Sequence, residues 1–202
     1  MEFLSLDVET SGLDPEQDQI LEFGAVIEDT NNLLNFDEIP KFHAILKHDR
    51  YSGSAYAINM NARIFAILKE RVTIQDEQAK IEYDNKFNLV HAENLARDFY
   101  YWCMMNMKNI PTTTNKPIFL LVAGKNFTAF DMPFIKKLPE WEKFFKFRHR
   151  SIDPVTLYTD FIKDKIPPSL EECLKRAGIE EEVTHDAVQD AWQVIKILRK
   201  KY

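Results

Sequence analysis

Two carboxylic acids, Asp7 and Glu9, stand two positions apart in the first apolar segment of the chain. Successive side chains of a β-strand point to opposite faces, so both carboxylates are expected on one face, with Leu6 and Val8 on the other. Two neighbouring carboxylates repel each other unless a cation lies between them, and oxygen ligands suit Mg²⁺ or Mn²⁺. A solvated strand end also explains an isolated pair, because 32 of the 202 residues are acidic. Other residues must decide between these interpretations.

A third acid, Asp131, follows a continuous apolar run over residues 118–122. That run predicts a strand buried on both faces. Pro133 suits the first turn of a helix, so we expect Asp131 at a helix start. An acid in this position commonly does no more than cap the helix. Its place beyond the end of a central strand favours a side chain that faces a ligand.

His185 and Asp190 lie near the end of the chain, where residues 185–201 carry apolar side chains at helical spacing. Asp190 falls on a helix face that otherwise holds small or apolar residues, where a carboxylate needs a reason. On one regular helix the two residues would be about 140° apart, so we expect His185 in the preceding loop. A histidine at a helix start is usually structural, although an imidazole can also accept a proton near neutral pH.

The elements that must position these residues follow from the apolar periodicity. Strands are expected at residues 3–8, 20–28 and 41–46 as an antiparallel meander, and a helix is expected over 88–108. Ser169 begins a capping box and Gly178 ends the helix that follows it. This order predicts an α/β fold with a central mixed sheet of about five strands flanked by helices, in a single domain over residues 1–202.

Two further segments have more than one interpretation. The polar stretch 69–88 is expected to be an insertion, a lid or a partner surface. Residues 136–150 interleave six basic with four aromatic residues, a mixture that can track a nucleic-acid strand by charge and stacking. An amphipathic helix with a buried aromatic face is the better explanation, because aromatic residues at helical spacing usually belong to a core.

The composition excludes several classes of protein. The 26 basic and 32 acidic residues give a net charge of −6, the wrong sign for gripping nucleic acid by bulk electrostatics, so any such contact must be local or assisted by a metal. Cys103 and Cys173 show no pairing or zinc-site spacing, which favours a reducing, cytoplasmic setting. The first residues do not have the composition of a signal peptide. No apolar run approaches a membrane span, so no membrane partner is expected.

Together, the three acidic sites match an ordered set of motifs. The first motif covers residues 3–15 (FLSLDVETSGLDP) with the strand ILEFGAV at 20–26, the second is NFTAFD at 126–131, and the third is HDAVQD at 185–190. Residues 151–154 and 169–174 add further likeness. The chain resembles the DEDDh 3′-to-5′ exonucleases, the DnaQ-like or RNase T-like branch of the ribonuclease H-like superfamily. The resemblance implies a ribonuclease H-like fold over most of the chain.

Carried over position by position, the resemblance implies roles for nine residues. Two divalent cations, Mg²⁺ or Mn²⁺, are expected on Asp7, Glu9, Asp131 and Asp190, with His185 as the general base. Two metals and a base suit the hydrolysis of a phosphodiester. Four residues are expected to bind substrate: Thr10, Leu13, Asn61 and Asn126. Leu13 is equally well explained by packing, and many relatives carry His-Gly where Asn61-Ala62 stands in this chain.

The expected activity is removal of 5′-mononucleotides from the 3′ end of single-stranded nucleic acid, with DNA slightly favoured. An exoribonuclease that trims RNA or degrades short oligoribonucleotides is the alternative within the same class. A non-catalytic module that binds nucleic acid or a polymerase is the alternative from another class. A polymerase or other replication protein is therefore a candidate partner, besides the single-stranded DNA or RNA end itself.

Overall fold

Three long strands form the antiparallel meander that the sequence predicts. In the computed structural model, which describes residues 1–108, 110 and 116–202, these are β1 (Glu2–Thr10), β2 (Ile20–Asp29) and β3 (Lys41–Lys47). Two short strands, β4 (Leu89–His91) and β6 (Val122–Ala123), join in parallel to β3 and β1. The sheet order is β4-β3-β2-β1-β6, which confirms a mixed five-stranded sheet and places β1 between β2 and β6.

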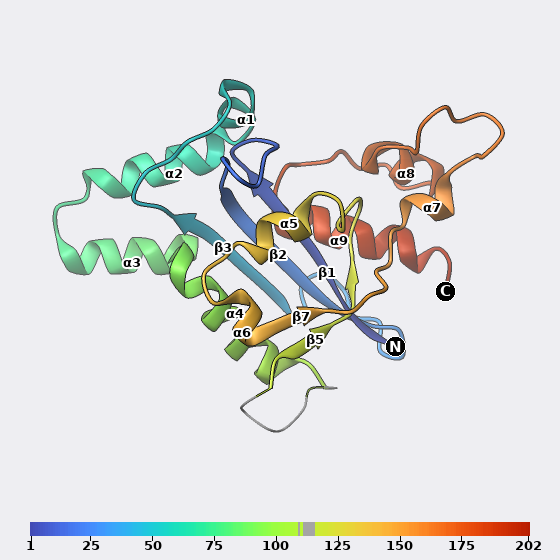
Figure 1. Ribbon diagram of the computed structural model, residues 1–202, viewed down its shortest axis with the longest axis horizontal. Helices are drawn as coiled ribbons and strands as arrows, with labels where there is room; N and C mark the ends of the chain where they lie inside the picture. The colour runs from blue at the N-terminus through green and yellow to red at the C-terminus, as the bar shows by residue number, and fades with distance from the viewer. Residues whose placement is uncertain (109, 111–115) are drawn as a thin grey trace.

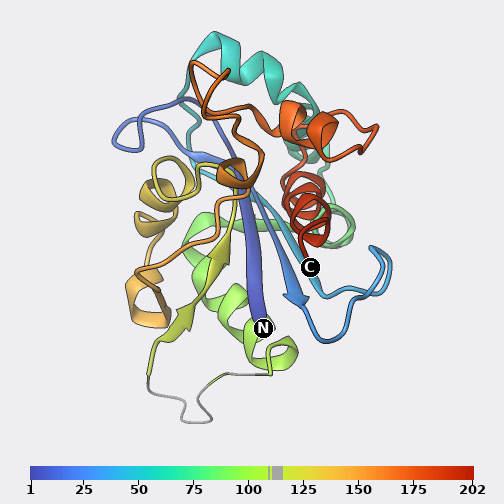
Figure 2. The same ribbon diagram turned by 90° about the vertical axis from the view of Figure 1, so that its right-hand side faces the viewer.

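Two helices cover opposite faces of this sheet, as Figures 1 and 2 show. On one face, α4 (Ala92–Asn106) packs against even-numbered residues of β1 such as Leu4 and Leu6. On the other, α9 (Ala187–Arg199) packs against Phe3 and Val26. Because side chains alternate along a strand, the odd-numbered residues of β1 face α9. Asp7 and Glu9 therefore point to the face that also carries the last helix of the chain.

Three helices follow β3 in the chain, namely α1 (Ala55–Met60), α2 (Ala62–Thr73) and α3 (Glu77–Phe87). Ile64 and Leu68 of α2 pack with Ile45 and Leu89 in a small separate core. Residues 69–88 contain the end of α2 and all of α3, which buries none of its side chains. The interpretation of this segment as an insertion, and of residues 1–202 as one domain, stays a prediction.

Short elements complete the chain between α4 and α9. They are β5 (Ile118–Leu120), which precedes β6, and then α5 (Asp131–Lys136), α6 (Trp141–Phe144), β7 (Phe145–Phe147), α7 (Val155–Tyr158) and α8 (Leu170–Arg176). Ser169 caps α8 by accepting a hydrogen bond from the Glu172 amide at 3.2 Å, and Gly178 adopts a left-handed φ of 69° after the helix, as the sequence predicts. No helix in the described part of the chain is long and apolar enough to cross a membrane.

Three sequence expectations about local structure are wrong. The helix expected over 88–108 begins at Ala92, because residues 89–91 pair with β3 as a strand. The run 118–122 is broken into β5 and β6, and Phe119 is 52% exposed, so this run is not buried on both faces. Residues 136–150 do not form one helix, since α6 passes directly into β7.

The aromatic residues of that last segment are nevertheless buried as the structural interpretation requires. Trp141 and Phe145 are 1% and 0% exposed, and their rings lie 4.6 Å apart. Phe144 and Phe147 pack partly buried against the same core. Trp141 and Phe145 are therefore unavailable for stacking on a nucleic-acid base, and Phe144 and Phe147 are only partly accessible.

Candidate active site

The acids of β1 lie in the C-terminal half of this strand, on the side facing α9. Glu9 is 7% exposed and Asp7 is partly buried. The register pairs Glu9 with Glu22 of β2 and Asp7 with Gly24. A Cβ on Gly24 would lie 2.3 to 2.5 Å from backbone atoms of residues 187 and 188. The glycine therefore lets the start of α9 approach the acids of β1 closely.

Asp131 is the first residue of α5, as the sequence predicts, and its side chain contacts β1. Its Oδ1 accepts a hydrogen bond from the backbone N–H of Val8 at 3.2 Å, and the side chain is 4% exposed. Val8 lies between Asp7 and Glu9, so this bond fixes Asp131 beside both of them. The contact joins residues 123 positions apart in the chain.

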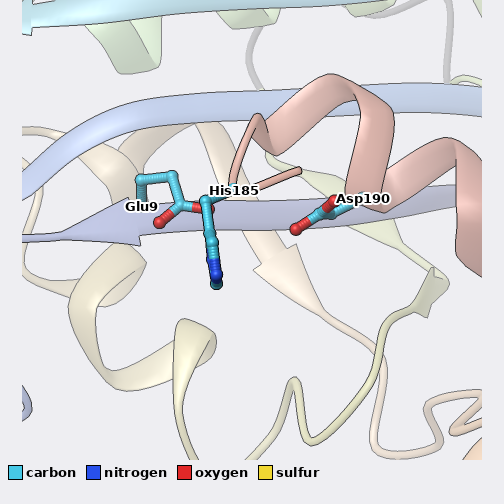
Figure 3. A group of neighbouring side chains, drawn as sticks. All are labelled: Glu9, His185 and Asp190. Atoms are coloured by element: carbon cyan, nitrogen blue, oxygen red, sulfur yellow. The ribbon is translucent and has the colours of Figure 1, made fainter. Parts of the chain in front are cut away.

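The third site contributes an aspartate from α9 and a histidine from the loop before it. His185 has a left-handed φ of 52° and precedes the helix, as expected. The amide and hydroxyl of Thr184 donate to Asp190 Oδ1 at 3.3 and 3.4 Å, which ties the loop to the helix. The His185 side chain is 47% exposed, and its Nδ1 lies 3.9 Å from Glu9 Oε1. Figure 3 shows the imidazole beside Glu9, with Asp190 on the neighbouring helix turn.

Crowding of carboxylates perturbs the acidity of this group. Burial, followed by the charges of Asp190 and Glu22, raises the pKa of Glu9 from 4.5 to about 8. Burial raises the pKa of Asp131 to about 7, and burial with the charges of Asp131 and Glu9 raises the pKa of Asp7. The pKa of Asp190 is also raised by burial. Four acids that resist ionisation in one place form an arrangement that cations stabilise.

The donor set fits hard divalent cations. Glu9, His185 and Asp190 each offer one ligand atom within 4.8 Å of the others. The carboxylates of Asp7 and Asp131 extend the oxygen donors towards α5. Oxygen-rich sites of this kind suit Mg²⁺ and Mn²⁺ rather than soft metals.

These residues line a pocket of about 740 Å³. Leu13, which is 83% exposed, lies in the wall of this pocket together with Tyr56 and Met60 of α1. The wall across the acids is formed by Lys125, Asn126 and residues 169–171, which are the cap and first residues of α8. Residues of α1 and of α8, which lie on either side of the end of β1 in Figure 1, thus both line the pocket that holds the carboxylates.

Comparison with known families identifies the family to which the chain belongs. Residues 4–119 match the family model RNase_T, described as an exonuclease. The chain belongs to this exonuclease family. The match covers more than half of the chain and includes Asp7 and Glu9, whereas Asp131, His185 and Asp190 lie beyond its end. No curated protein matches the chain in sequence.

Solved structures place the whole chain in the exonuclease fold. A structure of E. coli exonuclease I in complex with a dT13 oligonucleotide has 18% identity and a TM-score of 0.59, covering 99% of this chain and 40% of that chain. The zinc-bound form of the E. coli exonuclease I–ssDNA complex has 19% identity and a TM-score of 0.60, and the match covers 98% of this chain and 40% of that chain. Cell-death related nuclease 4 has 13% identity and a TM-score of 0.57, and the match covers 98% of this chain and 62% of that chain. The chain thus spans about 40% of the length of the first of these, and the ribonuclease H-like exonuclease fold is confirmed.

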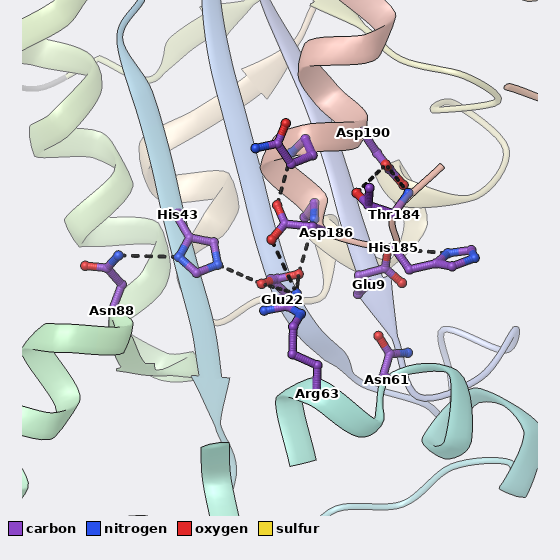
Figure 4. A network of polar contacts seen from close by, with 12 residues as sticks. Glu9, Glu22, His43, Asn61, Arg63, Asn88, Thr184, His185, Asp186 and Asp190 are labelled. Carbon is purple, nitrogen blue, oxygen red and sulfur yellow. Dashed lines mark hydrogen bonds and ion pairs between the residues drawn. The ribbon is translucent and has the colours of Figure 1, made fainter. Parts of the chain in front are cut away.

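The exonuclease motif on β2 contains an acid whose importance the sequence reasoning missed. Glu22 is fully buried, and both of its oxygens accept bonds from Arg63 at 2.8 and 2.7 Å. His43 Nε2 lies 2.7 Å from Glu22 Oε1, and the amide of Ala187 donates to Oε2 at 3.2 Å. Burial pushes the pKa of Glu22 up, but the bonds from His43 and Arg63 outweigh it and lower the pKa. Figure 4 shows this network behind Glu9.

This network fixes the start of α9 to the sheet. Arg63 also lies 3.6 Å from Asp186, which caps α9 through the Gln189 amide at 3.1 Å. The signal for it was available in the sequence, since Glu22 is a charged residue inside an otherwise apolar strand pattern. The partners Arg63 and His43 carry no comparable signal, because only folding brings them together.

The residues expected to bind substrate fall into two groups. Thr10, Leu13 and Asn126 line the pocket. Asn61 is 2% exposed and is not part of the described pocket wall, and its Nδ2 donates to the carbonyls of Thr10 at 3.1 Å and Ala57 at 3.0 Å. The structure thus places Asn61 as a brace between α1 and β1, and its contact with substrate stays a prediction.

Proposed function

We propose that this chain is a metal-dependent 3′-to-5′ exonuclease that releases 5′-mononucleotides from single-stranded nucleic acid, with DNA as the first substrate to test. The observation that carries the proposal is the convergence of four carboxylates and an exposed histidine, drawn from three distant segments, in one open pocket. A structural role would not require four acids with raised pKa values at one place.

In this proposal Asp7, Glu9, Asp131 and Asp190 hold two Mg²⁺ or Mn²⁺ ions. Such ions, when bound, provide a nucleophilic hydroxide near neutral pH and stabilise the charge that develops on the phosphate and the departing oxygen. The chain's own contribution is to hold the four carboxylates at fixed positions. The bond from Val8 holds Asp131, and the bonds from Thr184 hold Asp190.

His185 is the proposed general base. Its half-exposed imidazole can reach a water molecule over the acids, and an imidazole nitrogen is a suitable proton acceptor for general base catalysis. Glu9 at 3.9 Å stabilises the imidazolium that forms when the ring accepts a proton. The carboxylates are less suited to this step, because they serve as ligands.

The terminal nucleotide is proposed to lie on the apolar side of the pocket. Leu13, Tyr56 and Met60 expose apolar surface there, at 83%, 77% and 38%. A base can stack or pack against such side chains without sequence preference. Thr10 and Asn126 line the same pocket on either side of the acids and are proposed to contact the sugar and phosphate.

Single-stranded DNA is the favoured polymer because the solved structures similar in fold include E. coli exonuclease I bound to single-stranded oligonucleotides. An exoribonuclease would use the same acids and remains the second candidate. The presence of all five proposed catalytic side chains in one pocket argues against a non-catalytic binding module. A polymerase partner has no supporting surface among the described residues and is a proposal from the family resemblance alone.

The deciding experiment follows 5′-labelled single-stranded DNA and RNA of matched sequence on a sequencing gel in Mg²⁺, Mn²⁺ and EDTA. A ladder that shortens from the 3′ end only with metal supports the proposal, and the faster polymer identifies the substrate. Asp190→Asn should abolish the ladder, and His185→Ala should lower kcat more than it raises KM. Asp98→Asn, which changes a partly exposed acid of α4 that pairs with Arg97, is the matched control and should retain activity. Full activity of Asp190→Asn would refute the metal assignment.

A further inference from the structure

A second pocket, of about 620 Å³, adjoins the active-site pocket. Lys125, Asn126 and Ser169 line both pockets and form the boundary between them. The remaining wall comes from Asp153, α7 and the segment 159–168, which we call the α7–α8 loop. Its volume is in the range of pockets that bind small ligands and single nucleotides.

The α7–α8 loop exposes apolar side chains that a loop in water has no reason to expose. Phe161 is 80% exposed and Ile166 is 78% exposed, and both line this second pocket. Single exposed apolar residues are common on protein surfaces, but two in one pocket wall beside an active site indicate a binding surface. An aromatic ring next to an aliphatic side chain is a suitable platform for a nucleic-acid base.

The loop is held in place by Arg176 of α8. This guanidinium donates to Asp164 at 2.5 and 2.9 Å and to the carbonyl of Tyr158 at 2.7 Å. Asp164 in turn accepts from the amide of Asp160 at 2.8 Å. The apolar side chains are therefore displayed on an anchored segment, which lowers the entropy lost when they bind a ligand.

The charges in and around the second pocket suit a phosphate-containing strand. Lys125 is exposed at the boundary, and it lines the active-site pocket together with Asp131. Asp153 is the acid in the wall, but its oxygens accept bonds from the amides of Asn126 at 3.0 Å and Val155 at 2.9 Å. The second pocket therefore offers a phosphate one lysine and one acid, Asp153, whose oxygens are already bonded to backbone amides.

We propose that this second pocket binds the nucleotide that precedes the terminal one, with its base against Phe161 and Ile166 and its backbone beside Lys125. The proposal rests on the proposed function, because it follows the strand outward from the scissile phosphate. A terminal nucleotide under α1 places that phosphate over the acids, and the next nucleotide then extends across Lys125 and Asn126. Stacking on Phe161 requires an unpaired base, so this pocket selects single strands without reading their sequence.

The test combines a change in the protein with a change in the substrate. Phe161→Ala is compared with the parent chain on a thymidine oligonucleotide and on one that lacks the base at the second nucleotide from the 3′ end. We expect Phe161→Ala, or loss of that base, to lower kcat/KM by roughly 5- to 100-fold, as the loss of one stacked base does. The two changes together should cost no more than about twofold beyond either alone, because they remove the same contact.

Two controls separate this outcome from a general defect. Phe119→Ala removes another exposed phenylalanine, 52% exposed on β5 and part of neither pocket wall, and should leave kcat/KM unchanged. Phe161→Ala should lower kcat/KM for an oligonucleotide that lacks a base farther from the 3′ end as much as it does for the intact thymidine oligonucleotide. Additive effects of the protein and substrate changes, or unchanged kinetics of Phe161→Ala, would overturn the proposal.

Failure of the proposed function gives a different pattern. If the parent chain cleaves neither oligonucleotide, catalysis is refuted, and the same four combinations are measured by fluorescence anisotropy as binding affinities. Weaker binding of Phe161→Ala only when the second base is present would still support the pocket assignment. Equal binding in all four combinations would refute it.

Discussion

Arg63→Gln tests whether the buried network behind Glu9 supports the active site. Arg63 supplies two of the bonds to Glu22, at 2.8 and 2.7 Å, and Glu22 has no exposed surface. Removing one partner of a buried ion pair costs about 3–5 kcal/mol, because the other charge stays buried. The Arg63 side chain is 44% exposed and His43 remains beside Glu22, so we expect roughly 2–3 kcal/mol.

The loss should be visible in thermal unfolding and in turnover. A domain of about this size loses roughly 2–4 °C in Tm per kcal/mol, which gives a decrease of about 4–12 °C. Because Glu22 also accepts the amide bond that begins α9, kcat should fall as His185 and Asp190 lose their fixed position. Both quantities are measured in the same buffer at the same pH. EDTA is added for the unfolding measurement and Mn²⁺ for the turnover measurement.

The double variant Glu22→Gln with Arg63→Gln separates the two causes. The neutral amide that Glu22→Gln introduces keeps an oxygen for the Ala187 N–H and removes the unpaired charge, so most of the lost stability should return. Arg71→Gln is the control, since Arg71 forms a similar forked pair with Asp84 at 2.7 and 3.1 Å, away from the acids. It should lower stability while turnover is kept. A double variant as unstable as the sum of its single changes would refute the reasoning.

Three further predictions follow from the same geometry. Gly24→Ala places a methyl group 2.3 to 2.5 Å from the backbone of residues 187 and 188, so calorimetry should find a loss of about 1–3 kcal/mol, together with slower turnover. Leu13→Ala should change stability by no more than about 0.5 kcal/mol, because the side chain is 83% exposed, yet raise KM for a single-stranded oligonucleotide; an unchanged KM would exclude Leu13 from the substrate site. Without metal, the folded chain binds more protons than the unfolded chain between the usual pKa of Glu9, 4.5, and its raised pKa of about 8. The free energy of unfolding in EDTA should therefore fall by several kcal/mol as pH rises through this window, and a flat profile would contradict the buried position of Glu9.

Sequence reasoning predicted the sheet and the positions of the acids because both rest on local periodicity and on an ordered set of motifs. Asp7 and Glu9 share a face of β1, Asp131 begins α5, and His185 lies in the loop before α9. Each of these depends on the residue's own segment. The family and the fold that these motifs imply are confirmed by the comparisons.

The features that the sequence did not predict depend on contacts between distant segments. Residues 89–91 have the apolar content of a helix and become a strand only because β3 offers a free edge. Likewise, nothing near Arg63 in the sequence indicates Glu22 as its partner, 41 positions away. The pocket walls at Lys125 and Phe161 have the same origin, since α7, α8 and the end of β6 meet only in the folded chain.

The acidic character of the chain separates two contributions to strand binding that are usually measured together. With a net charge of −6 and four clustered acids, the metal-free active-site pocket offers little attraction to phosphate, so a strand gains affinity there mainly when cations are bound. The second pocket shares Lys125 with the active-site pocket and adds an apolar platform, and its acid is already bonded to backbone amides. Affinity for a single strand in EDTA should therefore depend on Phe161 and be indifferent to Asp190→Asn, whereas the gain in affinity on adding a divalent cation should depend on Asp190 and be indifferent to Phe161→Ala.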